Sequence, residues 1–490
     1  MRVKIGVIAV AAAAVVTAAC GGSAGGREAG AMGAAAVAPG SAAAYVAVDS
    51  NLDSAAWTKA KALLDRFPGK DEFIAHLRSS LQQEGLDWET DVKPALGSEI
   101  DLVWLDFQQN GDDVVGVTKP KDAAKFDALL AKGSDPLVQE QVDGWTVFAK
   151  SQAILDAFDK ARNDSGSLQD DSAFSDPFGA LPAESIAKAW ARGDPVQAAF
   201  DKRLQASGLP AGTTKSQFGT LEALTASVTP ASDGVQVNST FSGNLDLGTS
   251  EYTAELPASV PGGAIAYVSF DKVGDRINKL IDKLGGSIQN FDQQRAAIEL
   301  VLGYTLKDVF GLLNGEGGVA IYPNEGGQPA VLFVANVDDE SKARNILDRL
   351  ATIGTAMGEL HIQSVQVGSV EAKEIELGNG TSAYAAVFDG KLVATNSRAM
   401  LEKLQGSGPK LADDSPYKSA LASAAVPDQT TGFLYADAKE TIEYGLDYEK
   451  AHGGTIPQVD EDNLAPLRGL VVYGSQNGDD FTLTGFLGIQ

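Results

Sequence analysis

The amino-acid sequence repeats itself, and this duplication is the feature that most limits its fold. Four pairs of segments match in the same order along the chain: Val37–Asp49 with Val260–Asp271, Leu86–Val92 with Leu302–Val309, Leu96–Glu99 with Leu313–Glu316, and Asp170–Phe174 with Asp413–Tyr417. Chance matches would not keep a common order. A duplicated chain should fold as two units of one architecture, so we predict repeat 1 over 37–250 and repeat 2 over 256–490.

Within each repeat the pattern predicts antiparallel strands joined by tight turns. An Asn-Gly or Asp-Gly pair between apolar runs is the strongest short hairpin signal, because both turn residues adopt positive φ. Such pairs occur at Asn110-Gly111, Asp143-Gly144, Asp233-Gly234, Asp389-Gly390 and Asn477-Gly478. Helices lie between the strands, since Val273, Ile277 and Ile281 fall on one helical face. The predicted fold class is therefore α+β: two tandem homologous repeats, each an antiparallel sheet with helices packed on one face.

The N-terminus has the three zones of a secretory signal. Arg2 and Lys4 precede an apolar run over 5–16, which is too short to span a membrane, and small residues lead up to Cys20. This ending resembles the bacterial lipobox, except that Thr17 stands where that motif usually has Leu. The resemblance implies a signal peptide over 1–19 and lipidation of Cys20. Cys20 is the only cysteine in the chain, so it has no disulfide partner within it.

The residues that follow Cys20 suit a membrane anchor. Gly21–Ala36 consists almost wholly of Gly, Ala and Ser, so we predict a flexible tether over 20–36. The chain carries 65 acidic against 39 basic residues, a net charge of −26, which excludes a general nucleic-acid binder. The acidic residues could serve solubility or bind divalent cations. We favour solubility, because the acidic clusters lack the ligand spacing of a calcium-binding loop. We expect a protein anchored by lipid on the extracytoplasmic side of the cell membrane.

No residue pattern selects a catalytic, cofactor-binding or metal site. His76, His361 and His452 have no counterparts in the other repeat, and no zinc-binding spacing occurs. Gly21–Gly25 imitates a nucleophile elbow but lies in the predicted tether. Gly315–Ala320 imitates a dinucleotide fingerprint, but it precedes a strand and is interpreted as a tight loop. All five tryptophans fall in repeat 1, where they are core residues or an aromatic surface for sugar or peptidoglycan: Trp57, Trp88, Trp104, Trp145 and Trp190.

Three features together are similar to a known bacterial family. They are the Pro-Gly pair before a Tyr-Val strand, the Leu-Gly-Ser-Glu segment before a hairpin, and the exported N-terminus. They resemble the family known as the domain of unknown function 3352, whose members are typically lipoproteins or otherwise attached to membranes. The resemblance covers most of residues 37–490 and implies an envelope location. It implies no known activity, so no functional residue is carried over.

The sequence favours a membrane-anchored envelope lipoprotein that is not an enzyme and that acts as a binding or scaffold protein. Its partners would be the membrane, through the anchor, and an envelope protein, lipid or glycan, but not nucleic acid. Two alternatives stay open. A carrier of a lipid or another apolar ligand requires an apolar cavity between sheet and helices. A hydrolase that uses carboxylates requires two facing acids in a cleft, one of them with a raised pKa.

Overall fold

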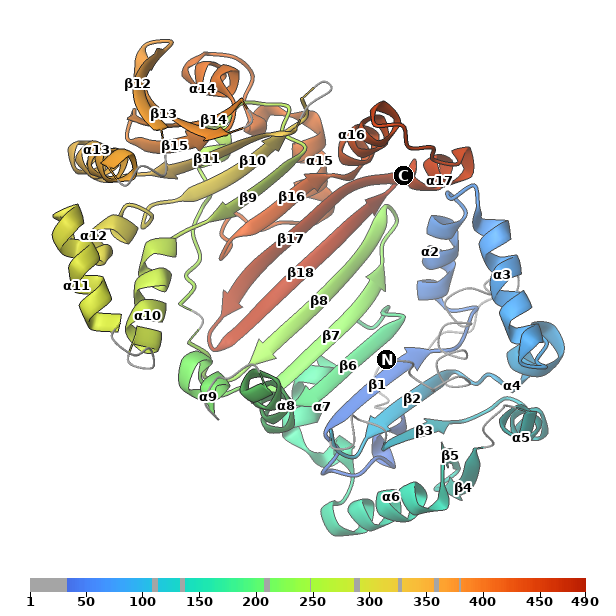
Figure 1. Ribbon diagram of the computed structural model, residues 1–490. Helices are drawn as coiled ribbons and strands as arrows, with labels where there is room; N and C mark the ends of the chain where they lie inside the picture. The colour runs from blue at the N-terminus through green and yellow to red at the C-terminus, as the bar shows by residue number, and fades with distance from the viewer. Residues whose placement is uncertain are drawn as a thin grey trace. The chain divides into compact units, whose positions relative to one another are not determined.

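The computed structural model describes residues 33–107, 113–132, 137–206, 212–246, 248–285, 291–324, 328–356, 361–378 and 380–490 (Figure 1). The chain divides into two compact units. Unit 1 contains the described residues up to Asp246 together with Asn477–Thr484 and Ile489–Gln490. Unit 2 contains Leu247–Gln476 and Gly485–Gly488. The chain is α+β, with helices mixed with antiparallel sheet, as the sequence predicts.

The described part of unit 1 starts with a short 3-10 helix and then alternates strands with helices. Its strands are β1 (Ala44–Asp49), β2 (Glu99–Trp104), β3 (Val114–Thr118), β4 (Val138–Val142), β5 (Trp145–Ala149), β6 (Ala187–Arg192), β7 (Ala223–Pro230) and β8 (Gly234–Ser242). Its helices are η1 (Gly33–Ala36), α2 (Ala55–Leu64), α3 (Lys70–Gln83), η2 (Trp88–Val92), α4 (Lys93–Ala95), α5 (Ala123–Lys132), α6 (Gln152–Ser165), η4 (Leu168–Asp170), α7 (Ser172–Gly179), α8 (Gly193–Ala206) and α9 (Thr213–Phe218).

The sheet of unit 1 is organised around β1, which pairs antiparallel with β2 on one side and β6 on the other. β2 continues to β3, and β3 pairs with β5 of the β4–β5 hairpin. On the other side β6 continues to β7 and β8. Residues from the end of the chain join this unit, because the Thr482 and Thr240 hydroxyls lie 2.9 Å apart and the Thr484 hydroxyl donates to the Asn238 side chain.

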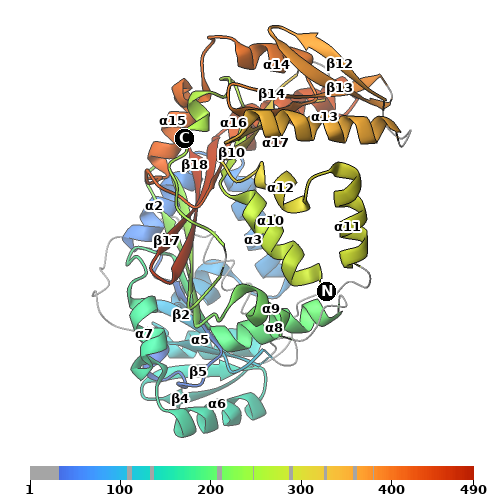
Figure 2. The ribbon, with the colours of Figure 1, turned by 90° about the vertical axis from the view of Figure 1, so that its left-hand side faces the viewer.

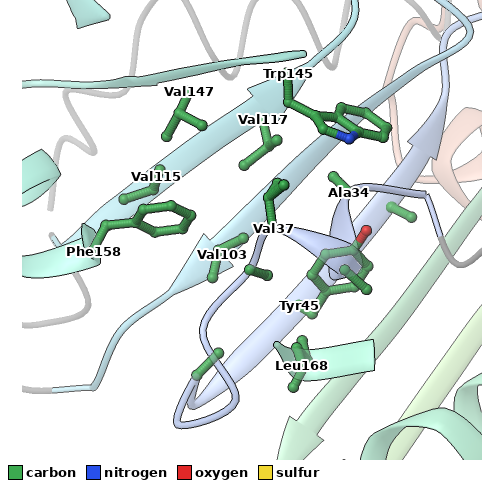
Figure 3. Packing of buried hydrophobic residues seen from close by; sticks show 14 of the residues in the cluster. Ala34, Val37, Tyr45, Val103, Val115, Val117, Trp145, Val147, Phe158 and Leu168 are labelled. Atoms are coloured by element: carbon green, nitrogen blue, oxygen red, sulfur yellow. The ribbon is translucent and has the colours of Figure 1, made fainter. Parts of the chain in front are cut away.

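Both faces of this sheet are buried, so the prediction of helices on one face is wrong for unit 1. One cluster packs β1, β2, β3 and β5 against η1, α6 and α7 (Figure 3), with Tyr45, Val103, Val115, Val117, Val147, Phe158 and Leu168 among its members. A second cluster holds Trp57, Leu81, Trp88, Phe126 and Phe148, and the partly buried Val48 and Leu102 of β1 and β2 pack against it. The physical reason lies in β3 and β5, where all five residues of each strand are buried. Continuous burial is the pattern of a strand covered on both sides.

Unit 2 follows the same alternation of strands and helices. Its strands are β9 (Ala266–Phe270), β10 (Gly317–Tyr322), β11 (Ala330–Asn336), β12 (His361–Val367), β13 (Val370–Gly378), β14 (Thr381–Phe388), β15 (Lys391–Thr395), β16 (Phe433–Asp437) and β17 (Leu467–Asn477). The last strand, β18 (Asp480–Ile489), is divided between the two units. Its helices are η5 (Leu256–Ala258), α10 (Val273–Gly285), α11 (Phe291–Leu302), α12 (Leu306–Gly311), α13 (Glu340–Ala356), α14 (Arg398–Gln405), η6 (Leu411–Asp413), α15 (Ser415–Ser423), α16 (Ala438–Ala451) and α17 (Gln458–Leu464).

The central strand of unit 2 is β9, which pairs antiparallel with β10 and β16. β10 continues to β11, which pairs with β15 of the β14–β15 hairpin. The β12–β13 hairpin extends this part of the sheet through the β13–β14 pair. β9 and β16 bury alternate residues, unlike the continuously buried strands of unit 1.

The hairpin turns agree with the sequence to different degrees. At Asp143-Gly144 and Asp389-Gly390 both residues adopt positive φ, so the expected turn forms for the expected reason. At Asn477-Gly478 only the glycine does, and Asp233-Gly234 joins β7 to β8 without positive φ at either residue. In that loop Ala231 and Ser232 supply additional length, so the turn requires no left-handed residue. Asn110-Gly111 lies outside the described residues.

The last residues of the predicted tether are ordered. Gly33–Ala36 forms η1, and Ala34 and Ala35 are fully buried in the core of unit 1 (Figure 3). The prediction of a flexible tether is therefore wrong for these four residues. Alanine has no side-chain entropy to lose and fits into narrow space, so an Ala-rich segment can be either a linker or a closely packed core segment.

Candidate functional site

A group of acidic and hydroxyl side chains, most of them buried, surrounds Glu316 in unit 2. Glu316 stands directly before β10, where the chain leaves the Gly315 loop and enters the sheet. Tyr267 and Ser269 extend from the adjacent strand β9. Tyr252 comes from the segment before η5, which is held by reciprocal backbone hydrogen bonds with Thr430. We call this group the Glu316 cluster.

Glu316 is 9% exposed and binds backbone N–H groups with both of its carboxylate oxygens. Oε2 accepts from the Glu255 N–H at 2.9 Å, and the Leu256 N–H lies 3.0 Å from Oε1 and 3.1 Å from Oε2. Burial raises the pKa of this carboxyl, and the two backbone donors act in the opposite direction. The carboxylate therefore holds the start of η5 against the edge of β10, in the manner of a cap on a helix N-terminus.

The phenols of the cluster are buried, or half-buried in the case of Tyr252, and they favour the protonated form. The Tyr252 hydroxyl lies 2.8 Å from the Ser269 hydroxyl, and burial raises the pKa of Tyr252 to about 12. Burial also raises the pKa of Tyr267, whose side chain is fully buried. Burial raises the pKa of Tyr417 on α15 as well. None of these groups offers a phenolate near neutral pH.

Two glycines of β10 make room for the rings of β9. A Cβ on Gly318 would lie 2.5 Å from the Tyr267 hydroxyl, and a Cβ on Gly317 would lie 2.1 Å from the Phe270 ring. The glycine-rich run that imitates a dinucleotide fingerprint is thus a loop that enters a strand, as predicted. Its glycines serve ring packing in a sheet rather than the approach of a phosphate.

A second buried carboxylate occupies the comparable position in unit 1. Glu99, the first residue of β2, is 7% exposed, and its backbone carbonyl accepts from the Thr118 hydroxyl at 2.7 Å. A Cβ on Gly33 would lie 2.6 Å from Glu99 Oε1, so the carboxylate lies directly against the first residue of η1. Asp101, two residues further along the same face of β2, is completely buried. Glu99 and Glu316 both lie at the start of a short 3-10 helix that precedes the central strand.

The other residues considered from sequence are dispersed. Cys20, the predicted signal peptide over 1–19 and Gly21–Gly25 lie outside the described residues. His76 lies on α3 in unit 1, His361 opens β12 beside Glu376, and His452 stacks on Tyr448 at the end of α16. All three are exposed. Within the described ranges no group of His, Cys, Asp or Glu side chains is arranged to hold a metal ion. Among the helices of those ranges, none is both long and apolar enough to cross a membrane.

The tryptophans are mainly core residues. Trp57, Trp88, Trp145 and Trp190 are buried, and Trp104 is half-buried. The core interpretation is therefore confirmed for four of the five.

Sequence reasoning used Glu99 and Glu316 as markers of the repeat and missed their role. The signal that could have identified it is an acidic residue that follows a Leu-Gly or Leu-Asn-Gly turn and stands at, or directly before, the first position of a strand. In an alternating strand such a residue shares a face with the residues at i+2 and i+4, so it points into the core when those residues are buried. Such a charge requires a hydrogen-bond donor there, and a free helix N-terminus supplies two.

Comparison with known proteins gives a family and a set of distant structural matches. No curated protein matches the chain. Two of the structural matches are crystal forms IV and I of TP0453, at 12% and 13% identity, with TM-scores of 0.26 and 0.24. Each covers 48% of this chain and 94% of the TP0453 chain, and likeness at this level carries no functional argument. The family described as "Protein of unknown function (DUF3352)" matches residues 130–477, which is more than half of the sequence, and the chain therefore belongs to that family.

Proposed function

We propose that this protein is an exported bacterial lipoprotein, attached to the membrane through Cys20, whose body is a non-catalytic binding or scaffold protein built from two tandem repeats. The proposal that the body is non-catalytic rests on the hydrogen bonds that the Glu316 carboxylate accepts. Both oxygens of this buried carboxylate are occupied by backbone N–H groups, so the strongest candidate for acid–base chemistry serves to hold a segment in place.

The central strands of the two units support the duplication. In unit 1 Tyr45 of β1 lies opposite Trp190 of β6, and both side chains are buried. In unit 2 Tyr267 of β9 lies opposite Tyr435 of β16, again with both side chains buried. An aromatic pair at the same register of the same strand pair is a specific correspondence, because a slip of one residue would place these rings on the other face of the sheet.

The helices that cover these aromatic pairs support the duplication independently. In unit 1 the Phe174 ring of α7 meets the Trp190 ring edge-on, at 5.3 Å between centroids and 89° between planes. In unit 2 the Tyr417 ring of α15 meets the Tyr435 ring edge-on, at 5.1 Å and 88°. Phe174 and Tyr417 are the aromatic residues that end the matched Asp-Asp-Ser segments. The sequence match and the ring geometry thus identify the same pair of positions.

The experiment that tests the attachment uses the full chain expressed in a bacterium with a lipoprotein pathway. The N-terminal peptide should carry a diacylglyceryl mass on Cys20, and the protein should partition into detergent. A Cys20→Ser variant should lack that mass and enter the aqueous phase, because two acyl chains are what make such an anchor stable. Ser23→Ala is the matched control and should keep both properties. An unmodified Cys20 would overturn the proposal.

The binding or scaffold role is tested by crosslinking in intact cells. A partner protein or glycan should be crosslinked to wild-type protein and to Glu316→Gln in equal amounts, because the carboxylate has no chemical role in this proposal. Turnover of a bond in the recovered partner that Glu316→Gln abolishes would contradict a non-catalytic body.

A further inference from the structure

We propose that strand β12 of unit 2 pairs antiparallel with β12 of a second copy of this chain, so that the protein forms a symmetric dimer through this edge. The inference rests on the proposed binding or scaffold role, for which it names a partner, and it does not require the lipid on Cys20. Figures 1 and 2 show β12 at the end of the unit 2 sheet, beyond β13 and close to α13 and α14.

The first observation is a row of backbone groups on β12 that point away from the sheet. Among the described residues β12 pairs only with β13. The two strands are joined by the two-residue turn Gly368-Ser369, so Val367 and Val370 form the closing hydrogen-bonded pair. Along an antiparallel ladder such pairs alternate with pairs whose N–H and C=O groups point outward. The residues of β12 with outward groups are therefore Ile362, Ser364 and Gln366.

Most of these outward groups are available for pairing. Within the described residues, the outward N–H and C=O groups of Ile362 and Ser364 have no hydrogen-bond partner. The Gln366 carbonyl accepts from Arg398 Nη2 at 2.6 Å and keeps its second lone pair. A row of unpaired N–H and C=O groups is the template on which another chain adds a strand.

Two helices hold β12, so its open edge has a fixed geometry. Lys373 of β13 donates to the Ser364 hydroxyl at 2.9 Å and forms an ion pair with Asp348 of α13 at 2.7 Å. At the end of the strand, Gln405 of α14 donates to the Val367 carbonyl at 3.0 Å. A strand that is already ordered in this way loses little conformational entropy when it pairs.

Unit 1 has an edge strand that is protected in a way that β12 is not. Its strand β4 has five residues and contains Glu140, which lies near Asp156 and Asp159 of α6. Short length and charge are common protections of a sheet edge against pairing. β12 has seven residues and contains no Asp, Glu, Lys, Arg or Pro. The β12–β13 hairpin also has no counterpart between α5 and β4 among the described residues of unit 1.

The exposed side chains of β12 argue against a partner of other chemistry. They are His361, Gln363, Ser364 and Gln366. A lipid surface or an apolar protein patch would require exposed apolar side chains, and a charged peptide would require charges of opposite sign on the strand. β12 supplies neither, so recognition at this edge has to come from the backbone groups themselves.

A second copy satisfies those backbone groups by symmetry. A two-fold axis at Ser364 places Ser364 opposite itself and Ile362 opposite Gln366 of the other copy, so all three outward residues of each strand pair in one register. Like charges that face each other destabilise paired strands, and a symmetric pair brings two identical strands together. An uncharged strand avoids this cost, which matters in a chain with a net charge of −26.

The first test is the oligomeric state of the full chain carrying Cys20→Ser, which removes its only cysteine. Analytical ultracentrifugation should show a concentration-dependent dimer. Ser364→Pro should raise its dissociation constant at least about tenfold, because proline removes an outward N–H and leaves the bonds to β13 in place. Ser364→Ala is the matched control, because it keeps that N–H and should dimerise like its parent. Circular dichroism shows whether each variant is folded.

The second test identifies the register by disulfide formation in the same parent. Across a hydrogen-bonded antiparallel pair two Cα atoms lie about 5.5 Å apart, which a disulfide can span. Ser364→Cys should therefore form a covalent dimer under mild oxidation. Ser369→Cys is the control on the same hairpin. It lies five residues from the symmetry axis, so its two copies would be roughly 30 Å apart and should stay unlinked.

Three results would overturn the inference. They are a monomer at every concentration, a Ser364→Pro variant that dimerises like its parent, and equal crosslinking of Ser364→Cys and Ser369→Cys. Oxidation in intact cells that links Ser364→Cys to a different protein, and not to a second copy, would assign the edge to that protein instead. The lipid mass on Cys20 and the crosslinking of other partners are measured separately, so failure here leaves the proposed function intact.

Discussion

Replacing Glu316 by alanine should destabilise the protein by about 2–4 kcal/mol. The substitution leaves the Glu255 and Leu256 N–H groups without their acceptor. A buried donor without a partner costs about 1–3 kcal/mol, and two donors are affected. Part of this loss is recovered, because burial raises the pKa of the carboxyl, so the ionised side chain was itself unfavourable there. Glu316→Gln keeps one acceptor oxygen and should lose about half as much stability.

The pH dependence has a definite sign. The pKa of Glu316 is higher in the folded protein than in the unfolded chain, where an exposed Glu has a pKa of about 4.3. The contribution of this group to stability is therefore greatest below that ordinary value and decreases as the pH rises through the raised pKa. Because glutamine does not titrate, the free energy of unfolding of the wild type should fall relative to that of Glu316→Gln as the pH rises through the raised pKa of Glu316.

Urea unfolding followed by far-ultraviolet circular dichroism measures these differences. Glu371→Ala is the control, because the Glu371 side chain on β13 is 63% exposed and makes only a 3.7 Å ion pair with Lys373. It should change stability by less than about 0.5 kcal/mol. The reasoning is refuted if Glu316→Ala unfolds with the stability of the control, or if the wild type gains on Glu316→Gln as the pH rises.

Two further predictions concern packing. Gly318→Ala should destabilise by about 1–3 kcal/mol, because the new Cβ would meet the Tyr267 hydroxyl, whereas Gly445→Ala in α16 meets nothing within 4 Å and should stabilise by about 0.5–1 kcal/mol. Thermal unfolding of the two variants checks the pair, and equal shifts would contradict the packing argument. Trp190→Ala should cost about 3–5 kcal/mol, since it removes the ring that Phe174 meets edge-on and the indole bond to the Ala173 carbonyl at 2.9 Å. Half-exposed Trp104→Ala is the comparison, and a cost as large there would mean that burial does not decide the effect.

The fold could be predicted where local chemistry decides the backbone. Asp143-Gly144 and Asp389-Gly390 form the expected turns because Gly, and Asp at modest cost, can adopt positive φ. The apolar face read for α10 from Val273, Ile277 and Ile281 corresponds to a helix with these bounds. These features require no knowledge of what packs against them.

The rest depends on neighbours that are distant in sequence. The strands β3 and β5 are buried on both faces. Helices η1 and α6 cover one side, and α2, α3 and α5 contribute to the cluster on the other. The role of Glu316 depends on Leu256, sixty residues earlier. Neither the two-sided burial of β3 and β5 nor the hydrogen bond between Glu316 and Leu256 can be predicted from the pattern of a single segment.

The burial of η1 has a mechanical consequence. Any traction on the chain N-terminal to Gly33 reaches the body first at η1 and the Glu99 carboxylate, and then at β1. β1 is the middle strand of a ladder, with six residues in register with β2 and five with β6. Tension along this strand would load those hydrogen bonds in shear, all at once rather than one after another as in unzipping. Traction applied there acts on a strand that is paired along both of its edges, so unit 1 should resist it until many backbone hydrogen bonds break together.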